Sequence, residues 1–139
     1  MLAYFDSSAL VKLVVDEEGS GVAAALWDGC DAAVSSRLAY PEVRAALAAA
    51  ARDHRIDARS LRTAQKDWET FWSAIQPVEL TATVERDAGR LADKHALGGA
   101  DAVHLASALA LGLPDLVVAA WDRRLREGVM SAGLRVTPA

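Results

Sequence analysis

Residues 2–13 read Leu-Ala-Tyr-Phe-Asp-Ser-Ser-Ala-Leu-Val-Lys-Leu, and the rest of the chain can be interpreted outward from them. The first four form a short, uncharged, largely apolar run, which predicts a buried strand of a parallel sheet. Ser7 and Ser8 can cap a helix that the next residues continue. Asp6 therefore stands at the carboxyl end of the strand, where open α/β sheets bind their ligands. The plainer alternative is that Asp6 only caps the helix.

The composition is that of a globular protein. A length of 139 residues with 53% hydrophobic residues predicts one domain over residues 1–139 with a core of its own. No apolar run approaches the roughly 20 residues that span a bilayer, and no signal peptide is visible, so we expect no membrane contact. Cys30 is the only cysteine, which favours a cytoplasmic location. The net charge of −4 disfavours non-specific binding to nucleic acid but allows local basic patches.

Short apolar runs alternate with segments of helical periodicity along the whole chain, which is typical of an α/β fold. The connection from the first strand to the second is helical, so we expect the two to be parallel and joined by a right-handed crossover. The later strands are predicted at 32–34, weakly at 77–80, most clearly at 116–120, and at the sheet edge at 134–136. The first predicted helix ends around 16–18, the second runs from about 21 to 27, and the third runs from the Ser35-Ser36 cap to about 54. Two more helices begin at 57 and at 81 or 83, and the last two are predicted over 101–112 and 123–131.

Three more acidic residues accompany these elements. Asp122 follows the clearest strand, as Asp6 follows the first. Pro41 must lie near the beginning of its helix, so Glu42 projects from an early turn, on a face of leucine and alanine. Asp101 opens a strongly apolar helix on its buried side, where a lone carboxylate needs a partner. A helix-dipole role for Glu42 and simple capping by Asp101 are the alternatives.

The surroundings of Asp101 carry two further signals. His104 lies three residues on, on roughly the same face; it could be a ligand or a proton shuttle, but we favour a hydrogen-bonded structural histidine. The Gly98-Gly99 pair is a turn, and it lacks the full glycine-rich fingerprint of a phosphate site. His95 is expected at a helix C-terminus, where a cation is favoured.

All four acids can converge at the carboxyl end of the predicted sheet. Two unit charges 4 Å apart repel by roughly 4 kcal/mol at an effective dielectric of 20, so a cluster without a lysine needs a compensating cation. Oxygen ligands favour a hard ion such as Mg²⁺ or Mn²⁺. A site of this kind can activate water for attack on a phosphodiester. A basic rim for a polyanion is predicted from the nearby arginines, each of which could instead lie on a solvated helix face: Arg37, Arg44, Arg52, Arg55, Arg123, Arg124 and Arg126.

An apolar stripe runs along the helix that begins at Asp57. Its members recur at spacings of three or four: Leu61, Ala64, Trp68, Phe71, Trp72 and Ile75. We interpret Trp68 and Trp72 as core or dimer-interface residues rather than as platforms for stacking bases. The stripe is wide for a chain of this size, so we expect part of it to be covered by a second copy or by a partner helix.

Four segments together resemble PIN-domain nucleases, and most closely the VapC toxins of bacterial type II toxin–antitoxin systems. They are Asp-Ser-Ser-Ala-Leu-Val-Lys at 6–12, Glu42, Asp-Ala-Val-His-Leu-Ala-Ser-Ala at 101–108, and Trp-Asp-Arg-Arg-Leu at 121–125. The resemblance spans almost the whole chain, in order. No single motif is highly specific, but the four together are.

The resemblance implies a PIN-like fold, in which a parallel sheet of strand order 3-2-1-4-5 is flanked by helices on both faces. It implies that Asp6, Glu42, Asp101 and Asp122 are the catalytic and metal-binding residues, with Mg²⁺ (or Mn²⁺) as cofactor and Asp6 and Asp101 at the positions most often assigned as ligands. It further implies a toxin that is a Mg-dependent endoribonuclease acting on single-stranded or structured RNA, a homodimer, and inhibition by a cognate VapB-type antitoxin. The chain departs from the family at Ala120, where Ser or Thr is common, so a hydroxyl contact is missing there.

Two other functions fit parts of the pattern. A small-substrate phosphohydrolase could use Asp6 as a covalent nucleophile, but such enzymes usually need a second Asp two residues later, and Ser8 stands there. A non-catalytic PIN-like binding module tends to lose acids from the quartet, whereas all four are present here.

Overall fold

The computed structural model describes all residues, 1–139, and its centre is a five-stranded sheet of order β3-β2-β1-β4-β5. Every neighbouring pair of strands is parallel, as the resemblance implied. The strands are β1 (Leu2–Phe5), β2 (Ala32–Ser36), β3 (Ile75–Val78), β4 (Val117–Ala119) and β5 (Arg135–Thr137). Because all of them run the same way, their carboxyl ends meet along one side, here called the carboxyl end of the sheet.

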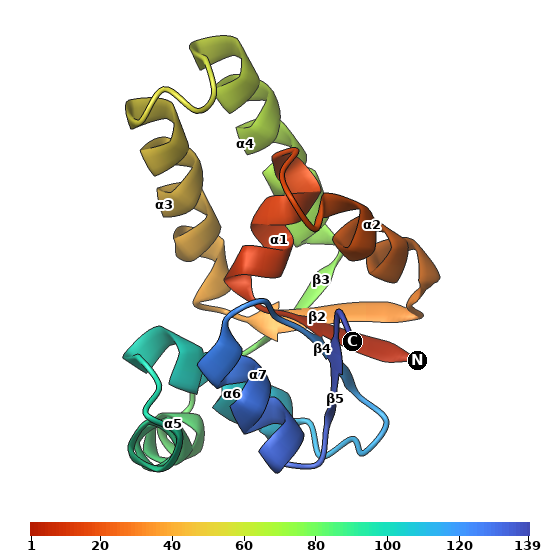
Figure 1. Cartoon of the computed structure of the whole chain (residues 1–139), viewed down its shortest axis with the longest axis vertical. Helices are drawn as coiled ribbons and strands as arrows, with labels where there is room; N and C mark the ends of the chain where they lie inside the picture. Colours follow the sequence, from red (N-terminus) through yellow and green to blue (C-terminus); the bar gives the residue numbers. More distant parts are fainter.

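Helices cover both faces of the sheet (Figure 1). One layer holds α1 (Ser7–Val14), α2 (Ser20–Gly29), α3 (Ala39–Arg52) and α4 (Ala58–Ser73). The other holds α5 (Ala82–His95), α6 (Gly99–Ala110) and α7 (Arg123–Ser131). No helix is long and apolar enough to cross a membrane.

The alternation of side chains along β1 divides the core in two. Ala3 and Phe5 pack with α1, α3 and α4, whereas Tyr4 points to the other face and packs with α5, α6 and α7. All three are fully buried. Burial on both faces explains why β1 reads as a continuous apolar run rather than an alternating one.

The aromatic stripe of α4 lies mainly inside. Trp68 is fully buried and packs against Trp72, with ring centroids 5.5 Å apart. Trp72 is only partly buried and also packs against Tyr40 at 5.6 Å. The prediction that Trp68 is a core residue is therefore confirmed, and Trp72 lies at the margin of the core.

Three local predictions were wrong. The third strand begins at Ile75 rather than at residue 77, because α4 ends at Ser73 and Ile75 pairs with Ala33 in the sheet. The cap of α1 is Asp6, not a serine, because the Asp6 carboxylate accepts a hydrogen bond from the backbone of Ala9. Residues 35 and 36 belong to β2, and α3 begins at Ala39 without a side-chain cap.

Candidate active site

The carboxyl end of the sheet gathers the four acids predicted from the sequence, here called the acidic quartet. Asp6 follows β1 directly, and Asp122 follows β4 and caps α7. Glu42 and Asp101 lie in the first turns of α3 and α6. Their charges influence one another, because Asp122 and Glu42 both raise the pKa of Asp101.

Asp6 is the most buried member of the quartet, with 4% of its surface exposed. Its Oδ1 accepts hydrogen bonds from the Ala9 amide and the Ser8 hydroxyl, both at 2.8 Å. Burial nevertheless raises the pKa of Asp6, and the charge of Asp101 adds to that effect. Capping uses only Oδ1, so a helix cap and a ligand-binding carboxylate are compatible roles for this residue.

Glu42 is held by two donors on one oxygen. His104 Nε2 lies 2.7 Å from its Oε1, and the Ser7 hydroxyl also donates to Oε1. Burial acts to raise the pKa of Glu42, but the bonds from His104 and Ser7 outweigh it and the pKa lies below its usual value. Glu42 is therefore an ionised carboxylate of fixed orientation.

Asp101 and Asp122 are more open to solvent. Asp122 is exposed, and its Oδ1 accepts from the Leu125 amide at 3.0 Å. Asp101 is partly buried; desolvation, followed by the negative charge of Asp122, raises its pKa. Asp101 is thus the member of the quartet whose negative charge is least compensated by the protein.

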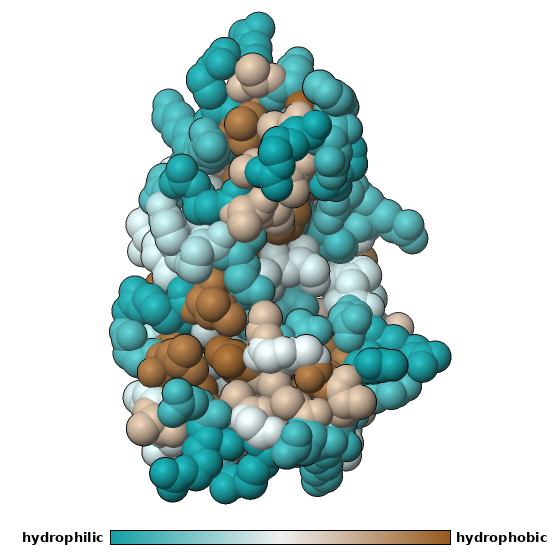
Figure 2. Space-filling model, turned by 90° about the vertical axis from the view of Figure 1, so that its left-hand side faces the viewer, coloured by the Kyte–Doolittle hydropathy of each residue, from teal (hydrophilic) through white to brown (hydrophobic).

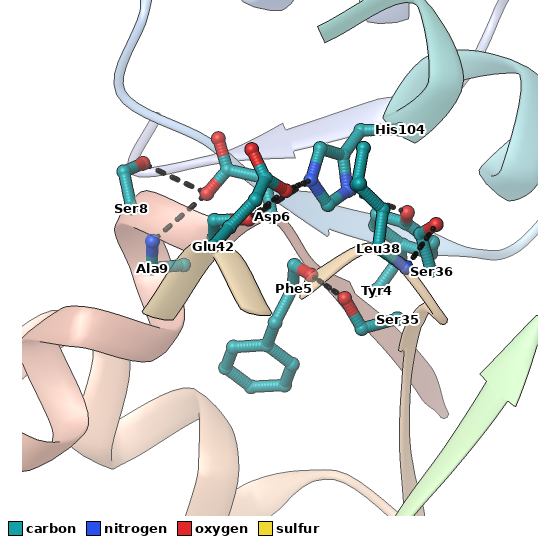
Figure 3. Close-up of polar contacts among 11 residues, drawn as sticks. Tyr4, Phe5, Asp6, Ser8, Ala9, Ser35, Ser36, Leu38, Glu42 and His104 are labelled. Carbon is teal, nitrogen blue, oxygen red and sulfur yellow. Dashed lines mark hydrogen bonds and ion pairs between the residues drawn. The ribbon is translucent and has the colours of Figure 1, made fainter. Parts of the chain in front are cut away.

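A shared pattern links Asp6, Glu42 and Asp122. In each, one carboxylate oxygen is tied to the protein, and the second oxygen has no protein partner yet is not sealed from solvent. Figure 3 shows the free oxygens of Asp6 and Glu42 pointing the same way, away from the sheet. The protein thus fixes the orientation of these carboxylates while leaving an oxygen of each available to a ligand.

The donor set fits a hard divalent cation. It consists of oxygen atoms only, no ion pair places a lysine or arginine on Asp6, Asp101 or Asp122, and the like charges raise the pKa of Asp101. The side chains as they stand form no group of three that could hold an ion by itself. Mg²⁺ does not require one, since it usually keeps several waters and binds through one or two carboxylates together with substrate phosphates.

Most of the arginines predicted to form a basic rim already have partners. Arg37 pairs with Glu79, and Arg44 pairs with Glu69 at 3.0 Å. These pairs are exposed, and exposed pairs contribute little free energy, so a phosphate group can compete for such side chains. Arg126 differs, because it donates to the carbonyls of Ala120 and Pro138 at 2.9 and 2.7 Å. It therefore braces the strand end that precedes Asp122.

The sequence did not reveal two residues of this site, Tyr4 and Ser7. The sequence predicts Tyr4 only as a residue of a buried strand, yet its hydroxyl lies 2.8 Å from His104 Nδ1. For Ser7 the sequence predicts only a helix cap, whereas its hydroxyl donates to Glu42 Oε1. The prediction that His104 is a hydrogen-bonded structural histidine is confirmed, because it is 2% exposed and both ring nitrogens have partners.

The proximity of Ser7, His104 and Glu42 does not make a serine-hydrolase triad. In such a triad the serine and the acid bind opposite nitrogens of the imidazole. Here both face Nε2, the Ser7 hydroxyl donates to Glu42, and Nδ1 is bound to Tyr4. The serine therefore has no base free to activate it.

Comparison with known proteins shows the family of this chain. The family model described as PIN domain matches residues 3–128. The chain is 69% identical over 138 residues to "Ribonuclease VapC45" of Mycobacterium tuberculosis (strain CDC 1551 / Oshkosh), covering 99% of this chain and 96% of that protein.

Two solved structures share the fold at low identity. The crystal structure of M. tuberculosis VapC20, described as a "Sarcin-Ricin loop cleaving toxin", has a TM-score of 0.68 at 19% identity, with 94% of this chain and 95% of that chain covered. A toxin–antitoxin complex from Klebsiella pneumoniae has a TM-score of 0.66 at 20% identity, with 99% and 98% covered. The chain belongs to the PIN-domain family, and within it to the VapC type.

Proposed function

We propose that this protein is a VapC-type toxin that hydrolyses RNA phosphodiester bonds with the help of a divalent metal ion. The observation that carries the proposal is the acidic quartet at the carboxyl end of the sheet, with uncompensated charge and free oxygens. Membership of the VapC type and the 69% identity to a protein named as a ribonuclease support it. An acidic cluster of this kind with no nucleophilic triad favours attack by water over a covalent intermediate.

In this proposal Asp6 and Asp101 would hold Mg²⁺ or Mn²⁺, with Glu42 and Asp122 beside them. A bound ion of this kind lowers the pKa of water and stabilises charge that develops on a phosphate. The protein's own part is to present carboxylates of fixed orientation: Oδ1 of Asp6 is anchored on α1 and Oε1 of Glu42 on His104. The exposed arginines around the site are suited to bind the RNA backbone on either side of the cut.

A small protein partner and a second copy of the chain complete the proposal. The Klebsiella pneumoniae neighbour is a toxin–antitoxin complex, which supports a cognate VapB-type antitoxin as the inhibitor of this protein. A homodimer is supported by the apolar surface near the site. An open hollow of about 520 Å³ is lined by Leu38, Tyr40, Pro41, Trp72 and Leu80 together with Arg37.

Metal dependence is tested by cleavage of a structured RNA by the purified protein in EDTA, followed by addition of Mg²⁺ or Mn²⁺. We expect no cleavage in EDTA and recovery with either ion. Asp6→Asn, purified in the same way, is the control for contaminating nucleases and should stay inactive throughout. Cleavage by the wild-type protein that persists in EDTA and is absent from the Asp6→Asn preparation would rule out the metal mechanism.

A further inference from the structure

A buried histidine joins the two helical layers beneath the site. His104 comes from α6, Glu42 from α3, and Tyr4 from β1. His104 Nδ1 lies 2.8 Å from the Tyr4 hydroxyl, and His104 Nε2 lies 2.7 Å from Glu42 Oε1 (Figure 3). The Tyr4 and His104 rings also meet edge to face, with centroids 5.9 Å apart. With 2% of its surface exposed, His104 cannot turn out to solvent to make other bonds.

The chemistry of its neighbours determines which ring nitrogen carries a proton. An ionised carboxylate only accepts hydrogen bonds, so Nε2 must carry a hydrogen to bond to Glu42. The Tyr4 hydroxyl can then donate to Nδ1 of the neutral ring. Burial raises the pKa of Tyr4, so this hydroxyl keeps its proton and remains a donor. The order of donation is Tyr4 to His104 to Glu42.

Hydrogen bonds to Oε1 fix the orientation of the Glu42 carboxylate. Oε1 receives hydrogen bonds from both His104 and Ser7, which come from different elements and lie 3.0 Å apart beside the same oxygen. A carboxylate tied at one oxygen by two donors cannot exchange its oxygens freely. Oε2 is then the carboxylate oxygen left without a protein partner.

We propose that His104, held in its tautomer by Tyr4, is a positioning residue that turns Glu42 Oε2 toward the metal and substrate. The inference rests on the proposed function and adds a residue to its machinery that need not touch RNA or metal. Partners that orient ligands in this way commonly change metal affinity or activity by about 10- to 100-fold when they are removed.

Two amide variants separate positioning from bulk. His104→Gln can place an amide N–H near the position of Nε2 and so keep the bond to Glu42. His104→Asn reaches only as far as Nδ1 and keeps the contact with Tyr4 instead. Both are neutral, polar and smaller than histidine, so a merely structural role predicts similar behaviour. His95→Gln, at the end of α5 against Gly128, serves as a control outside the site.

The measurements are Mn²⁺ affinity by calorimetry and rates of RNA cleavage over a range of RNA concentrations, which give kcat and KM separately. We expect His104→Asn to bind Mn²⁺ about 10- to 100-fold more weakly and to lose kcat with little change in KM. His104→Gln should recover much of both, and His95→Gln should match the wild type. Equal losses in the Gln and Asn variants, or no loss in either, would overturn the positioning role.

A measurement on the wild-type protein needs no variant to fold. The ¹⁵N NMR signals of His104 should show a protonated Nε2, and an unprotonated Nε2 would contradict the inference. These outcomes are distinct from failure of the proposed function. Wild-type protein that binds no Mn²⁺ and cleaves no RNA would refute the function, while the NMR result would still decide whether His104 donates to Glu42.

Discussion

Asp101 accepts no hydrogen bond that would offset its burial, unlike the other members of the acidic quartet. Desolvation and the charges of Asp122 and Glu42 raise its pKa. Replacing it with Asn keeps the size and removes one of the repelling charges. The unliganded protein should therefore gain about 1 kcal/mol of stability at pH 7, the usual scale for a substitution that removes an unfavourable interaction at a functional site. Thermal melts in EDTA measure this gain.

The pH dependence of that gain has a definite sign. An acid whose pKa is raised by folding destabilises the folded state while it is ionised, and this penalty disappears as the pH falls through its folded pKa. The difference between Asp101→Asn and wild type should therefore shrink as the pH falls from 7 toward 4. The stabilisation by Mg²⁺ should also be smaller in the variant, because an amide is a poorer ligand than a carboxylate. A variant that melts lower in EDTA and keeps the full Mg²⁺ shift would refute the role of Asp101.

The link between α1 and α2 lies close to Trp121, the residue that precedes Asp122. Gly19 has a φ of 90°, and an added Cβ would lie 2.8 Å from Lys12 Cε and 2.9 Å from Trp121 Cζ2. Lys12 Nζ lies over the Trp121 ring at 4.7 Å and also pairs with Glu17 at 3.0 Å. A side chain at residue 19 therefore has to displace the residue that precedes Asp122.

Gly19→Ala should destabilise the fold by at least about 1–2 kcal/mol, the cost of left-handed backbone for a residue with a Cβ. The matched control is Gly21→Ala in α2, where an added Cβ meets nothing within 4 Å. That variant should be neutral or more stable by about 0.5–1 kcal/mol, because alanine favours a helix. Urea unfolding compares the two, and equal effects would mean that neither the left-handed backbone at residue 19 nor the contact with Trp121 matters to stability.

At the scale of the whole molecule, the distribution of apolar surface favours association. Figure 2 shows apolar side chains gathered across the middle of one face, whereas both ends are largely hydrophilic. The hollow beside α3 includes Leu80, which is 51% exposed. We therefore expect a homodimer at micromolar concentration that Leu80→Asp weakens.

Met130 provides the control for this prediction, because it is 52% exposed but lies on α7, in the other helical layer. Met130→Asp should leave the dimer intact. Light scattering coupled to gel filtration gives the mass of each variant. A wild-type monomer, or equal weakening by both substitutions, would show that the hollow is not the dimer interface.

The sequence by itself determined the elements that carry the acids. A short apolar run followed by an acid predicts a buried strand that ends in a carboxylate, and the structure has this arrangement at Phe5-Asp6. The restriction on proline inside a helix likewise predicted that Pro41 and Glu42 lie near the beginning of α3. These are local effects, because burial on both faces of a parallel strand and the missing N–H of proline act on a few consecutive residues. The strand order came from resemblance to a family and was confirmed by the structure.

Only the tertiary structure decided how those acids are held. Tyr4 and His104 are 100 residues apart, and His104 and Glu42 are 62 apart. Periodicity gives the face of a helix but not the way two helices dock across a sheet, so no local pattern predicts that contact. The start of β3 was missed for a similar reason, since Ile75 fits the spacing of the helical stripe and is fixed as a strand residue by its pairing with Ala33. Local burial and backbone chemistry thus define the elements, whereas packing between distant elements orients the side chains that do the chemistry.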